Sequence, residues 1–208
     1  MNANKIMSIS PVVPVIAIEN IKDCLPLAKA LSEGGINIME ITLRTPQAFD
    51  AIKLISEKLP SMNIGAGTVC NKEDLIKAKQ SGAKFIFSPG ISQELIDIAK
   101  KENITLIPGV STSSEVMLAQ NNNIYHCKLF PATLSGGIEI LKAFNGPFSK
   151  MFFCPTGGIN KKNLNSFLNL KNVLCVGGTW IVPKEMIQKG NFDKITDLCK
   201  EAIKIAKG

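Results

Sequence analysis

Lys128 lies inside the apolar run "YHCKLF" (residues 125–130), which has the composition of a buried strand. A buried ammonium group is costly because it loses its hydration. The same loss disfavours the charged form, lowers the lysine pKa and leaves a free amine, the form that attacks a carbonyl to make a Schiff base. Lys128 is therefore a candidate for iminium chemistry, in which a neighbouring carbon–carbon bond is cleaved.

The run "INIMEITLRT" (residues 36–45) places a carboxylate and a guanidinium near a second apolar strand. An ionised Glu40 is costly within such a strand unless it is paired or used. Because side chains alternate along a strand, Glu40, Thr42 and Arg44 share one side if the strand stays regular that far. Glu40 is a candidate general acid and base. Arg44, the only arginine among 24 basic residues, offers with Thr68 a bidentate site for a substrate carboxylate.

The same residues allow interpretations without this chemistry. Lys128 and Glu40 together would make a structural ion pair, and Arg44 would then be an ordinary surface cation. An ionised Glu40 would also raise the lysine pKa and oppose the effect of burial. A metal-assisted route is weaker, because it needs His and carboxylate ligands and the chain has a single histidine, His126, which we expect to be a packed residue.

Two pairs of glycines follow apolar runs near the C-terminus. Gly157 and Gly158 come after "FFCPT", and Gly177 and Gly178 come after "VLCV" and before Thr179. One such pair is weak evidence, since helix caps and turns use glycine routinely. Two pairs at neighbouring strand ends expose several backbone N–H groups and favour a phosphate site.

Eight short β-rich runs must position these residues. They cover residues 12–18, 36–41, 62–67, 84–88, 104–109, 125–130, 150–155 and 172–177. Stretches with helical spacing lie between them, and the repeat of about 20–25 residues fits one strand, one helix and two loops. No G-x-G-x-x-G follows the first run, which argues against a doubly wound sheet. The pattern predicts an α/β fold, a compact (β/α)₈ (TIM) barrel with one domain over residues 1–208 and its site at the C-terminal strand ends.

Composition narrows the class of protein further. The net charge is +7, but the lysines are scattered without a basic run, which argues against a nucleic-acid partner. No apolar stretch is long enough for a membrane span and no secretory signal is evident, so we expect a cytoplasmic protein. The six cysteines contain no C-x-x-C pair, and three lie in strand-like runs, so we expect reduced thiols.

The order of the motifs "PVVPVI", "EITLRT", "GAGTV", "SPG", "IPGVST", "KLFPA", "FCPTGGI" and "GGTW" resembles that of the 2-keto-3-deoxy-6-phosphogluconate (KDPG) aldolases, over nearly the whole chain. That family also cleaves 4-hydroxy-2-oxoglutarate (KHG). The resemblance implies a class I aldolase on a (β/α)₈ barrel that uses no metal or organic cofactor. It also implies assembly as a homotrimer and a small phosphorylated 2-keto acid as the substrate.

The resemblance also implies roles for single residues. Lys128 would form the Schiff base, and Glu40 would shuttle protons. Arg44 and Thr68 would bind the carboxylate of the pyruvyl unit. The remaining residues would form the pocket wall or hold the phosphate: Pro89, Phe130, Gly157, Gly158, Gly178 and Thr179.

Two departures from the family pattern accompany the match. Many members have Ser where this chain has Thr179, and many have a longer N-terminal helix than the segment before "PVVPVI" allows. Two alternative functions also fit a barrel of this kind. One is a phosphosugar isomerase or epimerase that uses Glu40 as a plain acid and base. The other is a non-catalytic phosphosugar-binding protein in which Lys128 is only paired to Glu40.

Overall fold

Strands alternate with helices along the computed structural model of the protein, which describes residues 1–208. The strands are β1 (Val12–Ile16), β2 (Ile38–Thr42), β3 (Asn63–Gly67), β4 (Phe85–Phe87), β5 (Thr105–Ile107), β6 (Gly109–Val110), β7 (His126–Leu129), β8 (Phe152–Pro155) and β9 (Val176–Gly178). The helices are α1 (Ala3–Met7), η1 (Ile21–Asp23), α2 (Cys24–Glu33), α3 (Ala48–Lys58), α4 (Lys72–Gln80), α5 (Gln93–Lys101), α6 (Ser113–Asn121), α7 (Gly137–Phe144), α8 (Leu164–Leu168), α9 (Lys184–Gln188) and α10 (Phe192–Ala206). Each predicted run overlaps a strand, and the α/β class is confirmed.

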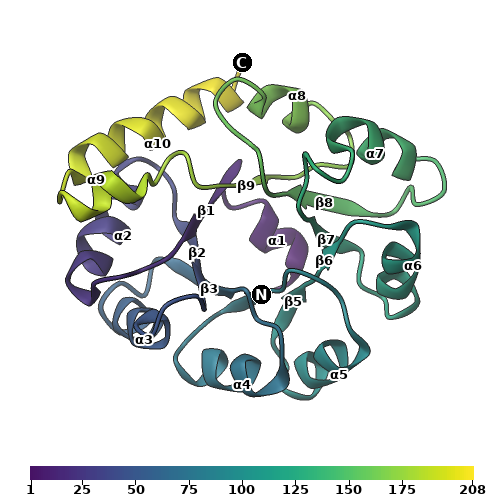
Figure 1. The fold of residues 1–208 in the computed structure, drawn as a ribbon, viewed down its shortest axis with the longest axis horizontal. Coiled ribbons are helices and arrows are strands. Elements are labelled where there is room, and N and C mark those ends of the chain that lie inside the picture. The colour runs from purple at the N-terminus through teal and green to yellow at the C-terminus, as the bar shows by residue number, and fades with distance from the viewer.

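Parallel pairing joins the strands into two sheets. The larger sheet has the order β5-β4-β3-β2-β1-β9 and forms a half-barrel, and the smaller has the order β6-β7-β8. Viewed down the shortest axis, the strands surround a common centre and α2 to α10 lie outside them (Figure 1). Because the strands are parallel, their C-terminal ends share one end of the fold, where the loops that follow them can form a site.

The structure does not show one continuous ladder of strands around the barrel. The fifth predicted strand is divided at Pro108, which has no N–H to donate, into β5 and β6. Between β8 and β9 the structure has only isolated bridges, Phe153 to Val173 and Thr156 to Gly177. The strand β9 covers only the last part of the eighth predicted run. Two separate sheets result from these interruptions.

In the loops that follow three of the strands, a polar side chain caps the N-terminus of the next helix. Asn71 Oδ1 accepts a hydrogen bond from the first turn of α4, Ser92 Oγ does so for α5, and Thr112 Oγ1 does so for α6. Such caps satisfy backbone N–H groups that have no partner within the helix, and each contributes about 1 kcal/mol. They therefore fix the direction in which the chain leaves the C-terminal ends of β3, β4 and β6.

The short helix α1, which the sequence pattern did not predict, lies at the N-terminal ends of the strands. Asn2 caps it by accepting a hydrogen bond from Lys5 N at 2.9 Å. Its Asn4 Oδ1 lies 3.3 Å from Nε2 of His126, the first residue of β7. His126 is packed as expected, stacking on Phe152 with ring centres 5.6 Å apart, and burial lowers its pKa.

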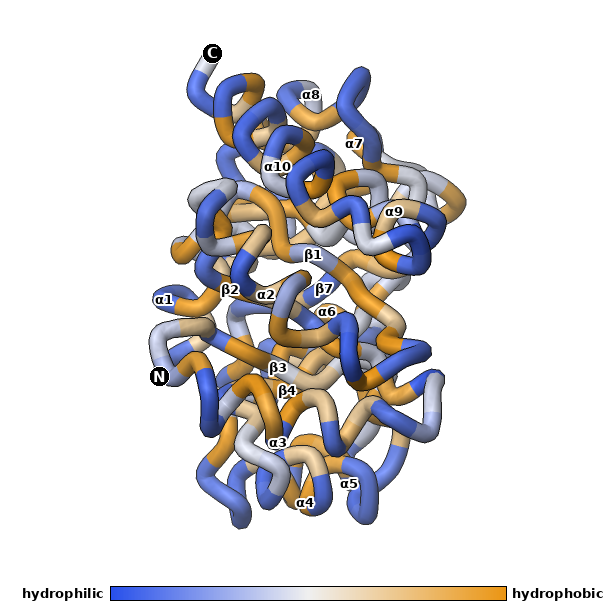
Figure 2. Tube along the Cα trace, turned by 90° about the vertical axis from the view of Figure 1, so that its left-hand side faces the viewer, coloured by the Kyte–Doolittle hydropathy of each residue, from blue (hydrophilic) through white to orange (hydrophobic).

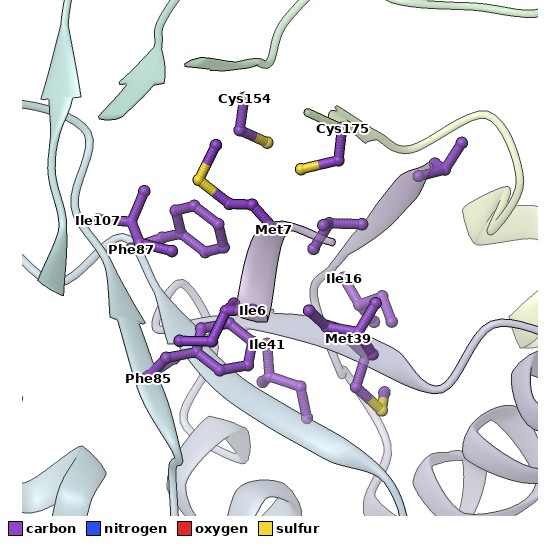
Figure 3. Close-up of a cluster of buried hydrophobic side chains, with 14 of the residues drawn as sticks. Ile6, Met7, Ile16, Met39, Ile41, Phe85, Phe87, Ile107, Cys154 and Cys175 are labelled. Carbon is purple, nitrogen blue, oxygen red and sulfur yellow. The ribbon is translucent and has the colours of Figure 1, made fainter. Parts of the chain in front are cut away.

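Two apolar residues of α1 enter the core completely. Ile6 and Met7 are both 0% exposed. Figure 3 draws them in the buried cluster that also contains Phe85, Phe87 and Ile107. In projection α1 lies within the ring of strands (Figure 1). A helix of five residues is not stable alone, so the burial of these side chains must hold it in place.

Replacing Ile6 by alanine is expected to lower the free energy of unfolding by about 2–4 kcal/mol, because it leaves a cavity in the core. Urea denaturation of the purified variant measures this. Leu134→Ala is the matched control, since Leu134 is 87% exposed and its truncation should change stability by less than about 0.5 kcal/mol. Equal stabilities for the two variants would contradict the packing described for α1.

Apolar residues gather inside the fold, and the outer helices alternate between hydrophobic and hydrophilic segments (Figure 2). The strand cysteines Cys127 and Cys154 are buried, as is Cys175 just before β9, and all six thiols are free. Among the six, only Cys70 is exposed.

No helix combines the length and apolar character that a membrane crossing requires.

Candidate active site

Lys128 and Glu40 meet in the interior from different sheets. Lys128 lies on β7 of the smaller sheet and Glu40 on β2 of the larger one. Lys128 Nζ is 3.0 Å from Glu40 Oε1 and 3.3 Å from Oε2. The two residues are only 5% and 1% exposed. The structure therefore holds them as a buried charged pair, a contact that the catalytic and the structural interpretations both require.

The surroundings of this pair leave little freedom to move. Lys128 Nζ lies 5.2 Å from the centre of the Phe87 ring and 5.5 Å from that of Phe130, within reach of a cation–π interaction. On the other side, a Cβ added at Gly67 of β3 would overlap the carboxylate of Glu40. The absence of a side chain at Gly67 thus makes the space in which this carboxylate lies.

Arg44 lies just beyond the end of β2, so the predicted alternation stops two residues before it. Its Nε donates a hydrogen bond to Thr42 Oγ1 at 3.1 Å. Neither terminal nitrogen of the guanidinium has a hydrogen-bond or ion-pair partner within the chain, and the side chain is exposed. A bidentate donor is therefore free to face an anion.

Thr68 follows directly after β3 and has a strained backbone. Its φ is +60°, in the left-handed region that β-branched residues rarely adopt. The preceding residue, Gly67, pairs in register with Thr42 and accepts a hydrogen bond from Leu43 N at 2.8 Å. Thr68 and Arg44 therefore lie at neighbouring strand ends, as their predicted joint role requires.

A cavity of about 140 Å³ lies at the C-terminal ends of the strands. Six of the predicted site residues line it: Arg44, Phe130, Gly157, Gly158, Gly178 and Thr179. Gly177, the other member of the second glycine pair, lines it as well, together with three residues that the sequence did not indicate: Val15, Thr156 and Ile159. Thr156 and Ile159 directly flank the first glycine pair, which is the signal that would have identified them.

The backbone of this cavity is rich in free donors. The N–H groups of Gly157, Gly158 and Thr179 donate no hydrogen bond to any group of the chain. Gly157 and Gly158 have φ values of +101° and +79°, so a side chain at either position would be strained. Residues with unpartnered N–H groups that line a cavity can bind an anionic oxygen.

Not every predicted residue joins this cavity. Pro89 lines a separate cavity of about 220 Å³ beside Cys70 and Ser88, and its place in the pocket wall stays a prediction. Thr68 lines neither of the two. A larger cavity of about 640 Å³ is at the opposite end of the strands, against Thr105 at the start of β5, and contains none of the predicted site residues.

The sequence was compared with models of known protein families. Residues 3–198 match the family described as KDPG and KHG aldolase. The chain belongs to this family. The resemblance predicted from the motifs is thereby confirmed, and the buried Lys128–Glu40 pair and the glycine-lined cavity are features of an aldolase-family chain.

Individual aldolases are similar to this chain over nearly its whole length. The KHG/KDPG aldolase of Escherichia coli (strain K12) is 45% identical over 206 residues, which are 99% of this chain and 97% of that protein. A solved KDPG aldolase from Legionella pneumophila, with pyruvate captured as a covalent carbinolamine, has a TM-score of 0.95, 46% identity and coverage of 97% and 98% of the two chains. The KDPG aldolase of Zymomonas mobilis ZM4 with 3-phosphoglycerate has a TM-score of 0.92, 41% identity and coverage of 97% and 94%.

One carboxylate organises the loop between β6 and α6 of this aldolase-family chain. Glu115 Oε2 accepts hydrogen bonds from the backbone N and the hydroxyl of both Ser111 and Thr112, at 2.7–3.1 Å. Burial by itself would raise the pKa of Glu115. The hydrogen bonds from Ser111 and Thr112 outweigh burial and lower this pKa from its ordinary value of 4.5.

Glu115→Gln is therefore expected to destabilise the fold at pH 7 by about 1 kcal/mol, because a charged acceptor is replaced by a neutral amide oxygen, which forms weaker hydrogen bonds. A pKa lowered by folding contributes stability above the unfolded value, and that contribution disappears as pH falls through the folded value. The difference between wild type and variant should thus shrink below about pH 4.5. Urea denaturation at several pH values measures it. Glu139→Gln at an exposed position is the control, and a pH-independent effect at Glu115 would contradict this prediction.

Proposed function

We propose that this protein is a class I aldolase that cleaves KDPG to pyruvate and glyceraldehyde 3-phosphate, and also cleaves KHG to pyruvate and glyoxylate. The observation that carries the proposal is the buried contact of Lys128 with Glu40 in a chain of the KDPG and KHG aldolase family. The E. coli relative is named for both substrates, and the Legionella enzyme holds pyruvate as a covalent carbinolamine. A nucleophilic amine is needed for such an adduct.

The chemistry begins with a proton transfer within the pair. The Lys128 ammonium gives a proton to the Glu40 carboxylate at 3.0 Å, and the free amine adds to the C2 carbonyl of the substrate. Glu40 then protonates the carbinolamine hydroxyl, which leaves as water and gives the iminium. Because the pair is buried, bulk water competes little with this transfer.

Cleavage follows from the same two residues. The Glu40 carboxylate takes the proton of the C4 hydroxyl while the C3–C4 bond breaks. The electron pair of that bond moves toward the iminium, which becomes a neutral enamine. The aldehyde product leaves. Glu40 then protonates the enamine carbon, and hydrolysis of the resulting iminium releases pyruvate and restores the Lys128 amine.

The cavity and the strand ends beside it offer a contact for each end of the substrate. The unpartnered terminal nitrogens of Arg44, with Thr68 at the neighbouring strand end, bind the pyruvyl carboxylate. The free N–H groups of Gly157, Gly158 and Thr179 hold the phosphate of KDPG. The Zymomonas relative was solved with 3-phosphoglycerate, a ligand that also has a carboxylate and a phosphate. The shorter KHG presents a second carboxylate at the glycine end.

The proposal extends to the whole fold and its assembly. The two sheets act as one compact (β/α)₈ barrel over residues 1–208, supported by the bridges between β8 and β9 and by the continuity of β5 with β6. The protein works in the cytoplasm, which fits its free thiols. It assembles as a homotrimer, as its family resemblance implies, and light scattering of the purified protein tests this.

Trapping with pyruvate and sodium borohydride tests the mechanism. Reduction of the iminium should leave pyruvate bound irreversibly, and peptide mass analysis should place the added mass on Lys128. A lactate dehydrogenase-coupled assay should show pyruvate release from KDPG. An unmodified Lys128 in an enzyme that releases pyruvate would overturn the Schiff-base mechanism.

The same two assays separate the alternatives. A phosphosugar isomerase or epimerase that uses Glu40 as a plain acid and base would convert substrate without a borohydride adduct. A phosphosugar-binding protein would bind KDPG without releasing pyruvate. Either result would overturn the proposed function.

A further inference from the structure

Thr42, the last residue of β2, lies in the sequence between Glu40 and Arg44 and has no role in the proposal above. It is 1% exposed, although its side chain is polar. Its hydroxyl makes two hydrogen bonds. It donates to the carbonyl of Ile16 at the end of β1 at 3.0 Å, and it accepts from Arg44 Nε at 3.1 Å. A buried hydroxyl with both contacts made is held in one orientation.

The direction of the two bonds follows from their chemistry. A carbonyl oxygen can only accept, so the single hydroxyl proton of Thr42 is committed to Ile16. The oxygen then turns its lone pairs to Arg44, whose guanidinium can only donate. Binding through Nε fixes the plane of the guanidinium and leaves both terminal nitrogens, which have no partner in the chain, for a ligand.

The support for Thr42 is itself rigid. The residue pairs in register with Gly67 of β3, and Leu43 N donates to Gly67 O at 2.8 Å. Ile16 is the last residue of β1 and pairs with Ile41. Thr42 is therefore fixed between two neighbouring strands, while the exposed Arg44 lies beyond the last residue of its strand.

We propose that Thr42 is a positioning residue, which orients Arg44 before substrate arrives and thereby sets the affinity for the pyruvyl carboxylate. This inference rests on the proposed function. Without the hydroxyl, the guanidinium loses its anchor and must be ordered at the moment of binding. Thr42→Val keeps the shape of the side chain and should raise the KM for KDPG about three- to tenfold. The kcat should change little, because the Lys128–Glu40 pair is intact.

A matched control separates positioning from a general loss of stability. Thr196 of α10 donates its hydroxyl to the carbonyl of Ala30 at 3.0 Å and is 8% exposed, so Thr196→Val removes the same kind of buried hydrogen bond away from the site. Both valine variants should melt at lower temperature than wild type. Only Thr42→Val should raise KM, and Thr42→Ser, which restores the hydroxyl, should return KM close to the wild-type value.

Two further measurements tie the effect to Arg44. The half-saturating pyruvate concentration for borohydride trapping should rise with KM in Thr42→Val, whereas inhibition by inorganic phosphate should not change. In an Arg44→Met background, Thr42→Val should raise KM no further, since the residue acts only through Arg44. A full additional increase in that background would overturn the proposal.

The outcomes distinguish this inference from the function on which it rests. A wild-type protein that neither releases pyruvate nor forms an adduct would overturn the proposed aldolase activity itself. An active wild type with Thr42→Val unchanged in KM, or changed only as much as Thr196→Val, would overturn the role of Thr42 alone.

Discussion

Lys128→Met is expected to lower kcat for KDPG cleavage by about 10⁴- to 10⁶-fold, because the nucleophile that forms the iminium is removed. Methionine has nearly the length of lysine and fits the apolar surroundings of Phe87 and Phe130. The loss should therefore reflect the missing amine rather than a missing volume. Pyruvate release, measured in the coupled assay, and the absence of a borohydride adduct report the result.

The same substitution has a second, separable consequence for stability. Glu40 is 1% exposed and would be left as a buried carboxylate without its cation. Removing one partner of such a pair lowers the free energy of unfolding by about 3–5 kcal/mol. Replacing both partners by uncharged groups often changes this free energy little. The double variant Lys128→Met/Glu40→Gln should therefore regain most of the stability of the wild type.

Stability and activity should thus separate between the single and double variants. Urea denaturation should show recovery in Lys128→Met/Glu40→Gln, while its pyruvate release stays undetectable. If the double variant regained turnover, or if Lys128→Met retained it, Lys128 would be a structural cation only. Such turnover would also exclude the non-catalytic sugar-phosphate-binding protein and would favour an enzyme that does not use the Lys128 amine.

Gly67→Ala is expected to lower kcat by about 100-fold or more, although the change adds only one methyl group. A Cβ at this position would overlap Oε1, Cγ and Cδ of Glu40. Because Gly67 is paired in β3 with Thr42, its backbone cannot retreat without disturbing the sheet, and the carboxylate must move instead. A displacement of about 1 Å at a catalytic group costs about 100-fold in rate.

Gly146→Ala is the matched control for this variant. Gly146 lies in the loop after α7, where the nearest atom to an added Cβ is at an ordinary distance of 3.6 Å. The kcat of Gly146→Ala should equal that of the wild type. Kinetics on KDPG and a thermal melt of both variants make the comparison. A Gly67→Ala enzyme with wild-type kcat would show that the space at Gly67 does not determine the position of Glu40.

The alternation of strands and helices could be read from the sequence, because hydrophobic periodicity and turn residues are properties of short segments. Each of the eight runs overlaps a strand. The predicted strand boundaries agree less well with the structure. Pro108 divides the fifth predicted strand, and β9 covers only the end of the run over residues 172–177. The helix α1 was missed because five residues are too few to show a period.

The sequence by itself determined which residues have the chemistry of an aldolase and which motifs relate the chain to that family. Residue type and local spacing are enough for that. Only the tertiary structure decided which of them meet. Lys128 and Glu40 are 88 positions apart in the chain and come within 3.0 Å of each other across two sheets. Pro89 lines another cavity, and Thr42 connects Arg44 to β1. Such contacts depend on the register of strands far apart in the chain, which no short segment specifies.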